Sequence, residues 1–432
     1  MNKEKQCNAL PHGGDWAGYE IEYGEKPLDF SMNVNPLGIP ACVCDAIAKV
    51  AASADRYPDP LCRDLRAAIA KAESTDAMRI KADQVFCGNG AADIIFRLAK
   101  VLKVIAAPKM NAAFNKDCTV MAGNSHPVLQ LTAPTFSEYE TAFASEGWEI
   151  RRHPLRVENG FQLDETILEE IDQHFNPEET DSHSINEEIN QFSNYNEGPD
   201  VLFLCEPNNP TGVTTDPALL KRILKRCQET GTILVIDECF NGFLDDPAAH
   251  SMKDFLSEYD NLVILKAFTK LYGMAGVRLG YCLCSNPDII ERLQQAGPPW
   301  NVSSRAQTAG IAALQETEHI QHGKAIVRQE RPWLINELHR LGITQVYGEA
   351  NYLLFHCSGN PEDTPGSAQC NMPDSTQAGA LSEAPLHEAL RSRGILIRDC
   401  SNYHGLCKGW YRIAVRTHEE NVKLIATLEE IL

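Results

Sequence analysis

The sequence has no long apolar run, no basic excess and no cysteine framework, and each absence excludes a class of protein. No apolar stretch among the 432 residues approaches the roughly 20 residues that a membrane helix needs. The N-terminus has no apolar core behind a basic start, so we expect no secretory signal. The formal net charge of -20 argues against nucleic acid and anionic membranes, because their phosphates attract basic surfaces. We therefore expect a soluble, cytoplasmic protein.

The fifteen cysteines are scattered through apparent helices and strands, a distribution that favours reduced thiols. Cys42 and Cys44 form a C-x-C pair without a second pair at ligand spacing, so we expect no metal site. Hydrophobic residues make up 43% and charged residues 23%, as in ordinary globular proteins. At this length, two domains of unequal size are the default expectation.

Short, continuously apolar runs separated by helical stretches predict an α/β fold. Such runs are typical of buried parallel strands joined by crossover helices, and they lie at residues 201–206, 232–237 and 262–268. We expect a large domain at residues 61–300 and a smaller α+β domain at 301–432. Residues 1–60 would form an N-terminal arm that joins the small domain. Polar stretches without clear periodicity predict surface insertions at about 104–127, 174–198 and 358–384.

Polar side chains follow all three apolar runs. Asn209 lies in PNNPTG after the first run, Asp237 ends the second, and Lys270 follows the third. The carboxyl ends of parallel strands meet at one edge of a sheet, where ligands bind. Taken singly, these residues would be a turn former, a helix cap and a surface lysine. Together they predict one shared site.

The segments PNNPTG, DECF and AFTKLYGMAGVRLGY resemble the fold type I family that depends on pyridoxal 5'-phosphate, the aspartate aminotransferase superfamily. The resemblance covers nearly the whole chain apart from the insertions. It implies a large domain with a mostly parallel sheet plus a small α+β domain. It also implies that Lys270 holds the cofactor as a Schiff base and that Asp237 pairs with the protonated pyridine nitrogen. Asn209 would donate to the ring hydroxyl oxygen.

The segment GNGAADII precedes an expected helix and predicts a site for the cofactor phosphate. The backbone amides of Gly90, Ala91 and Ala92 would receive the phosphate at the positive end of that helix. By the resemblance, Arg278 adds a charge-assisted contact, and the ring of Phe136 stacks on the cofactor.

Three further positions follow from the resemblance. Tyr57 matches a tyrosine that reaches the cofactor phosphate of a neighbouring subunit, which implies a homodimer with shared active sites. Phe240 replaces a tyrosine that often contacts the cofactor ring oxygen, and Ala267 replaces a serine or threonine that often contacts the phosphate. Thr269 could supply part of that phosphate contact.

Within the superfamily, the sequence is most similar to the branch of threonine-phosphate decarboxylases and histidinol-phosphate aminotransferases. The segments that favour the decarboxylases are HGGD, DFSMNVNPLG, RYPDP, PPWNVSS, IRDCSNYHGL and WYRIAVRT. The expected reaction is decarboxylation of L-threonine O-3-phosphate to (R)-1-aminopropan-2-yl phosphate, for cobalamin biosynthesis. A histidinol-phosphate or related class I/II aminotransferase is the alternative, and a non-catalytic ligand sensor of the same fold is a remote one.

Both branches handle phosphorylated amino compounds, so the substrate pocket should contain cations. The resemblance implies that Arg412 binds the substrate carboxylate and that Arg398 and His12 contact its phosphate, with Asn33 nearby. The choice of reaction depends on which substrate bond lies perpendicular to the cofactor ring, and the sequence leaves that angle open. A nicotinamide-dependent oxidoreductase is not expected, because the sequence lacks the glycine-rich fingerprint with its later acidic residue.

Overall fold

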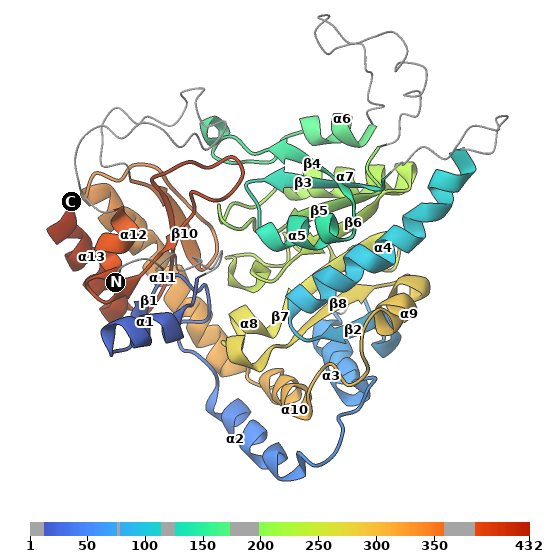
Figure 1. Ribbon diagram of the computed structural model, residues 1–432, viewed down its shortest axis with the longest axis horizontal. Coiled ribbons are helices and arrows are strands. Elements are labelled where there is room, and N and C mark those ends of the chain that lie inside the picture. Colours follow the sequence, from blue (N-terminus) through green and yellow to red (C-terminus); the bar gives the residue numbers. More distant parts are fainter. Residues whose placement is uncertain (1–12, 76–77, 114–125, 173–197, 358–384) are drawn as a thin grey trace, which may run out of the picture.

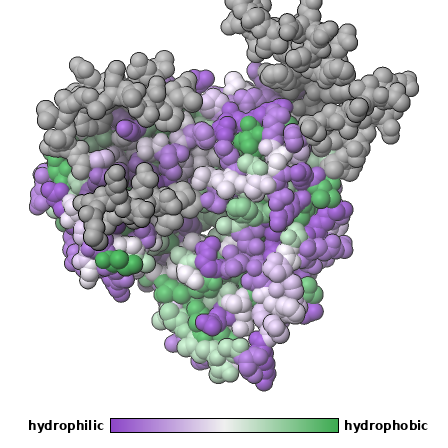
Figure 2. Space-filling model, in the orientation of Figure 1, coloured by the Kyte–Doolittle hydropathy of each residue, from purple (hydrophilic) through white to green (hydrophobic). Residues whose placement is uncertain are grey.

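The computed structural model describes residues 13–75, 78–113, 126–172, 198–357 and 385–432. A large sheet lies at its centre, with a smaller sheet beside it (Figure 1). Among the described helices, none is long and apolar enough to cross a membrane. The face in Figure 2 is largely hydrophilic, with apolar residues gathered where α2 (Ala41–Val50) lies.

The large sheet has seven strands in the order β2-β8-β7-β6-β5-β3-β4. β8 runs antiparallel to both neighbours, and the other strands run parallel to one another. Their bounds are β2 (Val85–Gly88), β3 (Val128–Ala133), β4 (Glu149–Pro154), β5 (Val201–Cys205), β6 (Ile233–Asp237), β7 (Leu262–Ala267) and β8 (Gly280–Cys284). The three apolar runs of the sequence form β5, β6 and β7, as expected. Cys205 pairs with Asp237 and Asp237 with Leu265, so these strands end at one edge.

Helices cover both faces of this sheet, because successive side chains of a strand point to opposite faces. On one face, Val235 and Val263 pack in a core with α4 (Ala91–Ala113), α5 (Ser137–Ser145) and α9 (Pro287–Gln295). On the other, Leu234 and Ile264 pack with α3 (Arg63–Glu73), α6 (Thr166–Asp172), α7 (Pro217–Thr230) and α10 (Ser304–Ala313). The central strands are buried on both sides, which explains their continuous apolar character.

The smaller sheet is antiparallel, in the order β12-β13-β10-β9. Its bounds are β9 (Val346–Tyr347), β10 (Tyr352–His356), β12 (Arg398–Asp399) and β13 (Trp410–Ala414). Beside it, β1 (Leu28–Asp29) pairs in parallel with β11 (Ile395–Leu396). Phe30 shares a core with residues of α11 (Thr317–Arg340), α12 (Leu386–Arg391) and α13 (His418–Ile431). A segment near the N-terminus thus packs with the C-terminal part, while the domain boundaries at 60 and 300 remain a prediction.

One expected insertion is wrong in part. Residues 104–113 continue α4, which extends from Ala91 to Ala113 and is the long helix at the right of Figure 1. Alanine and methionine are strong helix formers, four of these ten residues are alanine, and Ala106 is buried, so the helix extends past the expected end. Most of the remaining expected insertions, at 114–125, 173–197 and 358–384, lies outside the described residues.

Candidate active site

The structure brings Asn209, Asp237 and Lys270 to the same edge of the large sheet. Asp237 is the last residue of β6, and Asn209 lies in the loop after β5. Lys270 lies in the short helix α8 (Phe268–Leu271), directly after β7. From the small sheet, the Arg412 guanidinium donates a hydrogen bond to the Asn209 side-chain oxygen. The two sheets therefore meet at this site.

The Asp237 carboxylate is buried and accepts two hydrogen bonds. The Tyr139 hydroxyl donates to Oδ2 at 2.7 Å, and the Cys239 backbone N–H donates to Oδ1 at 2.9 Å. Hydrogen bonds to a charged carboxylate stabilise its ionised form. The site therefore supports a negative charge at the end of β6.

Lys270 carries the amine at this edge. Burial, and next the positive charge of Arg412, lower the pKa of Lys270 to about 8. Its Nζ lies 5.0 Å from the centroid of the Phe240 ring, which packs edge-on against Tyr352. A lysine with a lowered pKa has a larger neutral fraction near pH 7, and the neutral amine is the nucleophile.

The first residues of α4 and the side chain of Arg278 form a cradle for an anion. Gly90 has φ +84°, and a Cβ added there would lie 2.6 Å from Arg278 Nη2. A Cβ added at Gly280 would lie 2.6 Å from the Ala91 nitrogen. Glycine is thus needed at both positions, because a side chain would prevent Arg278 from approaching Gly90 and the start of α4 from approaching Gly280. The start of α4 at Ala91 and Ala92 presents free backbone N–H groups beside this guanidinium, an arrangement that favours phosphate.

Three other expected cofactor residues occupy different settings. Phe136 precedes α5, and its ring meets Tyr139 edge-on at 5.5 Å. Thr269 lies next to Lys270 in α8 and is partly buried. Tyr57 is 79% exposed and stacks on Trp300 with ring centroids 4.5 Å apart. The Tyr57 ring is therefore presented to solvent in the single chain.

Two arginines lie side by side on adjacent strands of the small sheet. Arg398 on β12 pairs in register with Arg412 on β13, and both side chains are buried. Arg398 donates to the Asn402 oxygen at 2.8 Å, and its guanidinium lies 5.4 Å from the Tyr403 ring centroid. Two like charges directly opposite each other are unfavourable. An anionic ligand between them would relieve this repulsion.

Asn33 lies in the segment that follows β1. It is 1% exposed, and both polar atoms of its side chain lack a hydrogen-bond partner in the described part of the chain. A buried amide left unpaired costs about 1–3 kcal/mol, so these atoms point to a ligand. His12, the other residue expected from this region, lies outside the described residues.

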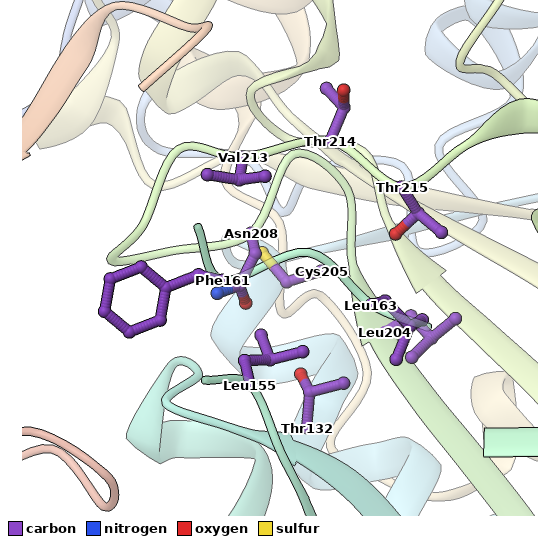
Figure 3. A pocket seen from close by; sticks show the side chains of 10 residues that line it. All are labelled: Thr132, Leu155, Phe161, Leu163, Leu204, Cys205, Asn208, Val213, Thr214 and Thr215. Carbon is purple, nitrogen blue, oxygen red and sulfur yellow. The ribbon is translucent and has the colours of Figure 1, made fainter. Parts of the chain in front are cut away.

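Hydrogen bonds of the neighbouring residue Asn208 fix the loop that carries Asn209. The Asn208 amide donates to the Pro134 carbonyl and to the Thr211 hydroxyl, both at 3.0 Å. Tyr352 donates to the Asn208 carbonyl at 2.8 Å. A cavity of about 10 Å³ lies beside Asn208 and Cys205 (Figure 3). It has room for about one water molecule and none for a cofactor, so it belongs to the support of the loop.

The family model for aminotransferase class I and II matches residues 25–428. The chain belongs to this family. Threonine-phosphate decarboxylase of Salmonella typhimurium is 31% identical over 425 residues, covering 98% of this chain and 96% of the relative. Histidinol-phosphate aminotransferase of Symbiobacterium thermophilum is 28% identical over 405 residues, covering 94% and 90%. A structure of histidinol-phosphate aminotransferase from Sinorhizobium meliloti in complex with pyridoxal-5'-phosphate aligns with a TM-score of 0.71 at 18% identity, covering 100% of this chain and 98% of that one.

This aminotransferase-family chain is an enzyme that depends on pyridoxal 5'-phosphate. Its residues fit that cofactor, since the Gly90 and Arg278 cradle suits a phosphate and the Asp237 carboxylate suits a cationic ring nitrogen. Lys270 supplies an amine for the aldehyde. The individual roles expected from the sequence remain predictions.

Tyr139 belongs to this aminotransferase-family site but is not among the residues predicted from the sequence. Tyr139 is three positions after Phe136, so both lie on the same side of the first turn of α5. That spacing could have identified it, although its hydrogen bond to Asp237 depends on how α5 packs against β6.

Proposed function

We propose that this enzyme decarboxylates L-threonine O-3-phosphate to (R)-1-aminopropan-2-yl phosphate, a step of cobalamin biosynthesis. The observation that carries the proposal is the buried Arg398 and Arg412 pair beside Lys270. A substrate with both a carboxylate and a phosphate offers one anion for each guanidinium. The relative from Salmonella typhimurium, named threonine-phosphate decarboxylase, supports the same substrate.

Arg412 is the better candidate for the carboxylate, because it lies nearest to the cofactor residues. It donates to Asn209 and to the Ser31 carbonyl at 3.0 Å, which fixes its guanidinium beside the expected ring site. Arg398 would then take the phosphate, with Asn33 as a neutral partner. A grip at two points orients the substrate, and orientation decides which bond breaks.

Pyridoxal 5'-phosphate, when bound, supplies an electron sink for the substrate bond that breaks. Asp237 would pair with the ring nitrogen of the cofactor, and Tyr139 and Cys239 hold Asp237 in place. Lys270 moves a proton at its Nζ, which its lowered pKa allows near neutral pH.

The test compares two substrates on the purified enzyme. With phosphothreonine, we expect release of carbon dioxide and formation of aminopropanol phosphate, exceeding any keto product formed with 2-oxoglutarate. Histidinol phosphate should turn over poorly. If histidinol phosphate reacts with 2-oxoglutarate while phosphothreonine is inert, the enzyme is the alternative aminotransferase.

We also propose a homodimer in which Tyr57 completes the partner's cofactor site. The support is the exposure of the stacked Tyr57 and Trp300 rings, 79% and 44%, because exposed aromatic pairs are typical of interfaces. Mixing inactive Tyr57→Ala and Lys270→Ala proteins should restore part of the activity through hybrid sites. An active monomer in sedimentation would contradict the proposal.

A further inference from the structure

The Tyr139 hydroxyl hydrogen-bonds to the Asp237 carboxylate and also interacts with the Cys205 thiol. The side chain is fully buried, and its oxygen lies 2.7 Å from Asp237 Oδ2. The other carboxylate oxygen accepts from the Cys239 backbone N–H at 2.9 Å. One donor on each oxygen fixes the plane of the carboxylate. Each oxygen still keeps a lone pair for a further donor.

The direction of the Tyr139 hydrogen bond follows from its surroundings. Burial, and next the charge of Asp237, raise the pKa of Tyr139 well above its usual value, so the phenol stays protonated and donates. The hydroxyl proton of Tyr139 is therefore directed at Asp237 Oδ2, and it holds that oxygen in place.

The Tyr139 ring also connects two parts of the site. It stacks on Phe203 of β5 with centroids 4.1 Å apart and meets Phe136 edge-on at 5.5 Å. Phe136 is the ring expected to cover the cofactor. A single side chain on α5 therefore touches the expected stacking residue and holds the carboxylate at the end of β6.

We propose that Tyr139 is a positioning residue that holds the Asp237 carboxylate in one orientation, and thereby sets the affinity of the enzyme for pyridoxal 5'-phosphate. The proposal rests on the role assigned to Asp237 in the proposed function. Tyr139 itself reaches the reaction only through Asp237.

The test is Tyr139→Phe in the full-length protein. This change keeps the ring that stacks on Phe203 and removes only the hydroxyl. We expect the dissociation constant of pyridoxal 5'-phosphate, measured on cofactor-free protein by fluorescence quenching, to rise about ten- to a hundredfold, as for loss of a hydrogen bond to a charged group. The absorbance maximum of the bound cofactor should also shift, because the Asp237 carboxylate is no longer held in one orientation.

Tyr281→Phe is the matched control, since the buried Tyr281 hydroxyl donates to the carboxylate of Glu73, which is not among the residues expected to hold the cofactor. Both variants should lower the melting temperature, and only Tyr139→Phe should change the cofactor affinity and the absorbance maximum of the bound cofactor. Equal cofactor affinity in the two variants would overturn the proposal. A wild-type protein without a cofactor adduct on Lys270 would overturn the site assignment as well, and borohydride reduction with peptide mapping distinguishes the two results.

Discussion

The cofactor side and the substrate side of the site are built differently. On the cofactor side, the fold already pairs the polar groups, since Asp237 accepts from Tyr139 and Cys239. On the substrate side, the Asn33 amide and the Arg412 Nε have no hydrogen-bond partner among the described residues. The first arrangement is preorganised by the protein. The second leaves buried polar groups unsatisfied, which a ligand must complete.

The largest effect should come from Lys270→Ala, which removes the amine from the cofactor side. We expect activity to fall by at least about 10²- to 10⁴-fold, the usual contribution of a proton-transferring group. Borohydride treatment followed by peptide mapping should find no adduct. Lys71→Ala, an exposed lysine on α3, is the control and should leave both unchanged. A persistent adduct in Lys270→Ala would contradict the assignment.

Asp237→Ala should cost far more activity than Phe240→Tyr, and this pair tests the preorganised side directly. The first change removes the carboxylate that is proposed to pair with the ring nitrogen, and it leaves the Tyr139 hydroxyl without this acceptor. The second adds one hydroxyl to a ring that packs against Tyr352. Steady-state rates and cofactor affinity measure both. Comparable losses would mean that the ring environment is misassigned.

The contrast between the two sides also explains what the sequence could predict. Asp237 ends an apolar run, and Asn209 and Lys270 lie within three positions after one, so the strand pattern predicts that they lie at one edge. The anion cradle at Gly90 could also be predicted, because a glycine directly before a helix is visible in the local sequence.

Other features depend on packing between distant segments. The opposition of Arg398 and Arg412 follows from the register of two strands, and the Tyr139 hydrogen bond follows from the position of α5 over the sheet. Neither leaves a periodic signal in the sequence. The extension of α4 to Ala113 differs from the sequence prediction for another reason, since Pro108 and Lys109 are residue types typical of surface loops.

Arg398→Ala tests the substrate side. Loss of a buried charge-assisted contact is worth about 1.5–3 kcal/mol, so phosphothreonine should bind about ten- to a hundredfold more weakly. Binding of threonine, which lacks the phosphate, should barely change. Arg398→Lys should recover little, because an ammonium lacks the planar fork. Equal losses for both ligands would show that Arg398 supports the fold instead of the phosphate.

The smallest effect concerns pH, and it links the two sides. The pKa of Lys270 is lowered from its ordinary 10.5 to about 8 by burial and next by the charge of Arg412. Only the neutral amine attacks an aldehyde, so attachment of pyridoxal 5'-phosphate to cofactor-free protein should speed up as pH rises, with a midpoint near 8.

Arg412→Ala removes a cation that disfavours the charged amine, so the midpoint should move to higher pH. Arg398→Ala is the control, since burial, Arg412 and Arg278 are the influences that lower this pKa. Stopped-flow absorbance across the pH range measures all three proteins. A midpoint that stays fixed in Arg412→Ala would show that Arg412 does not lower the lysine pKa and that the substrate side does not tune the cofactor side.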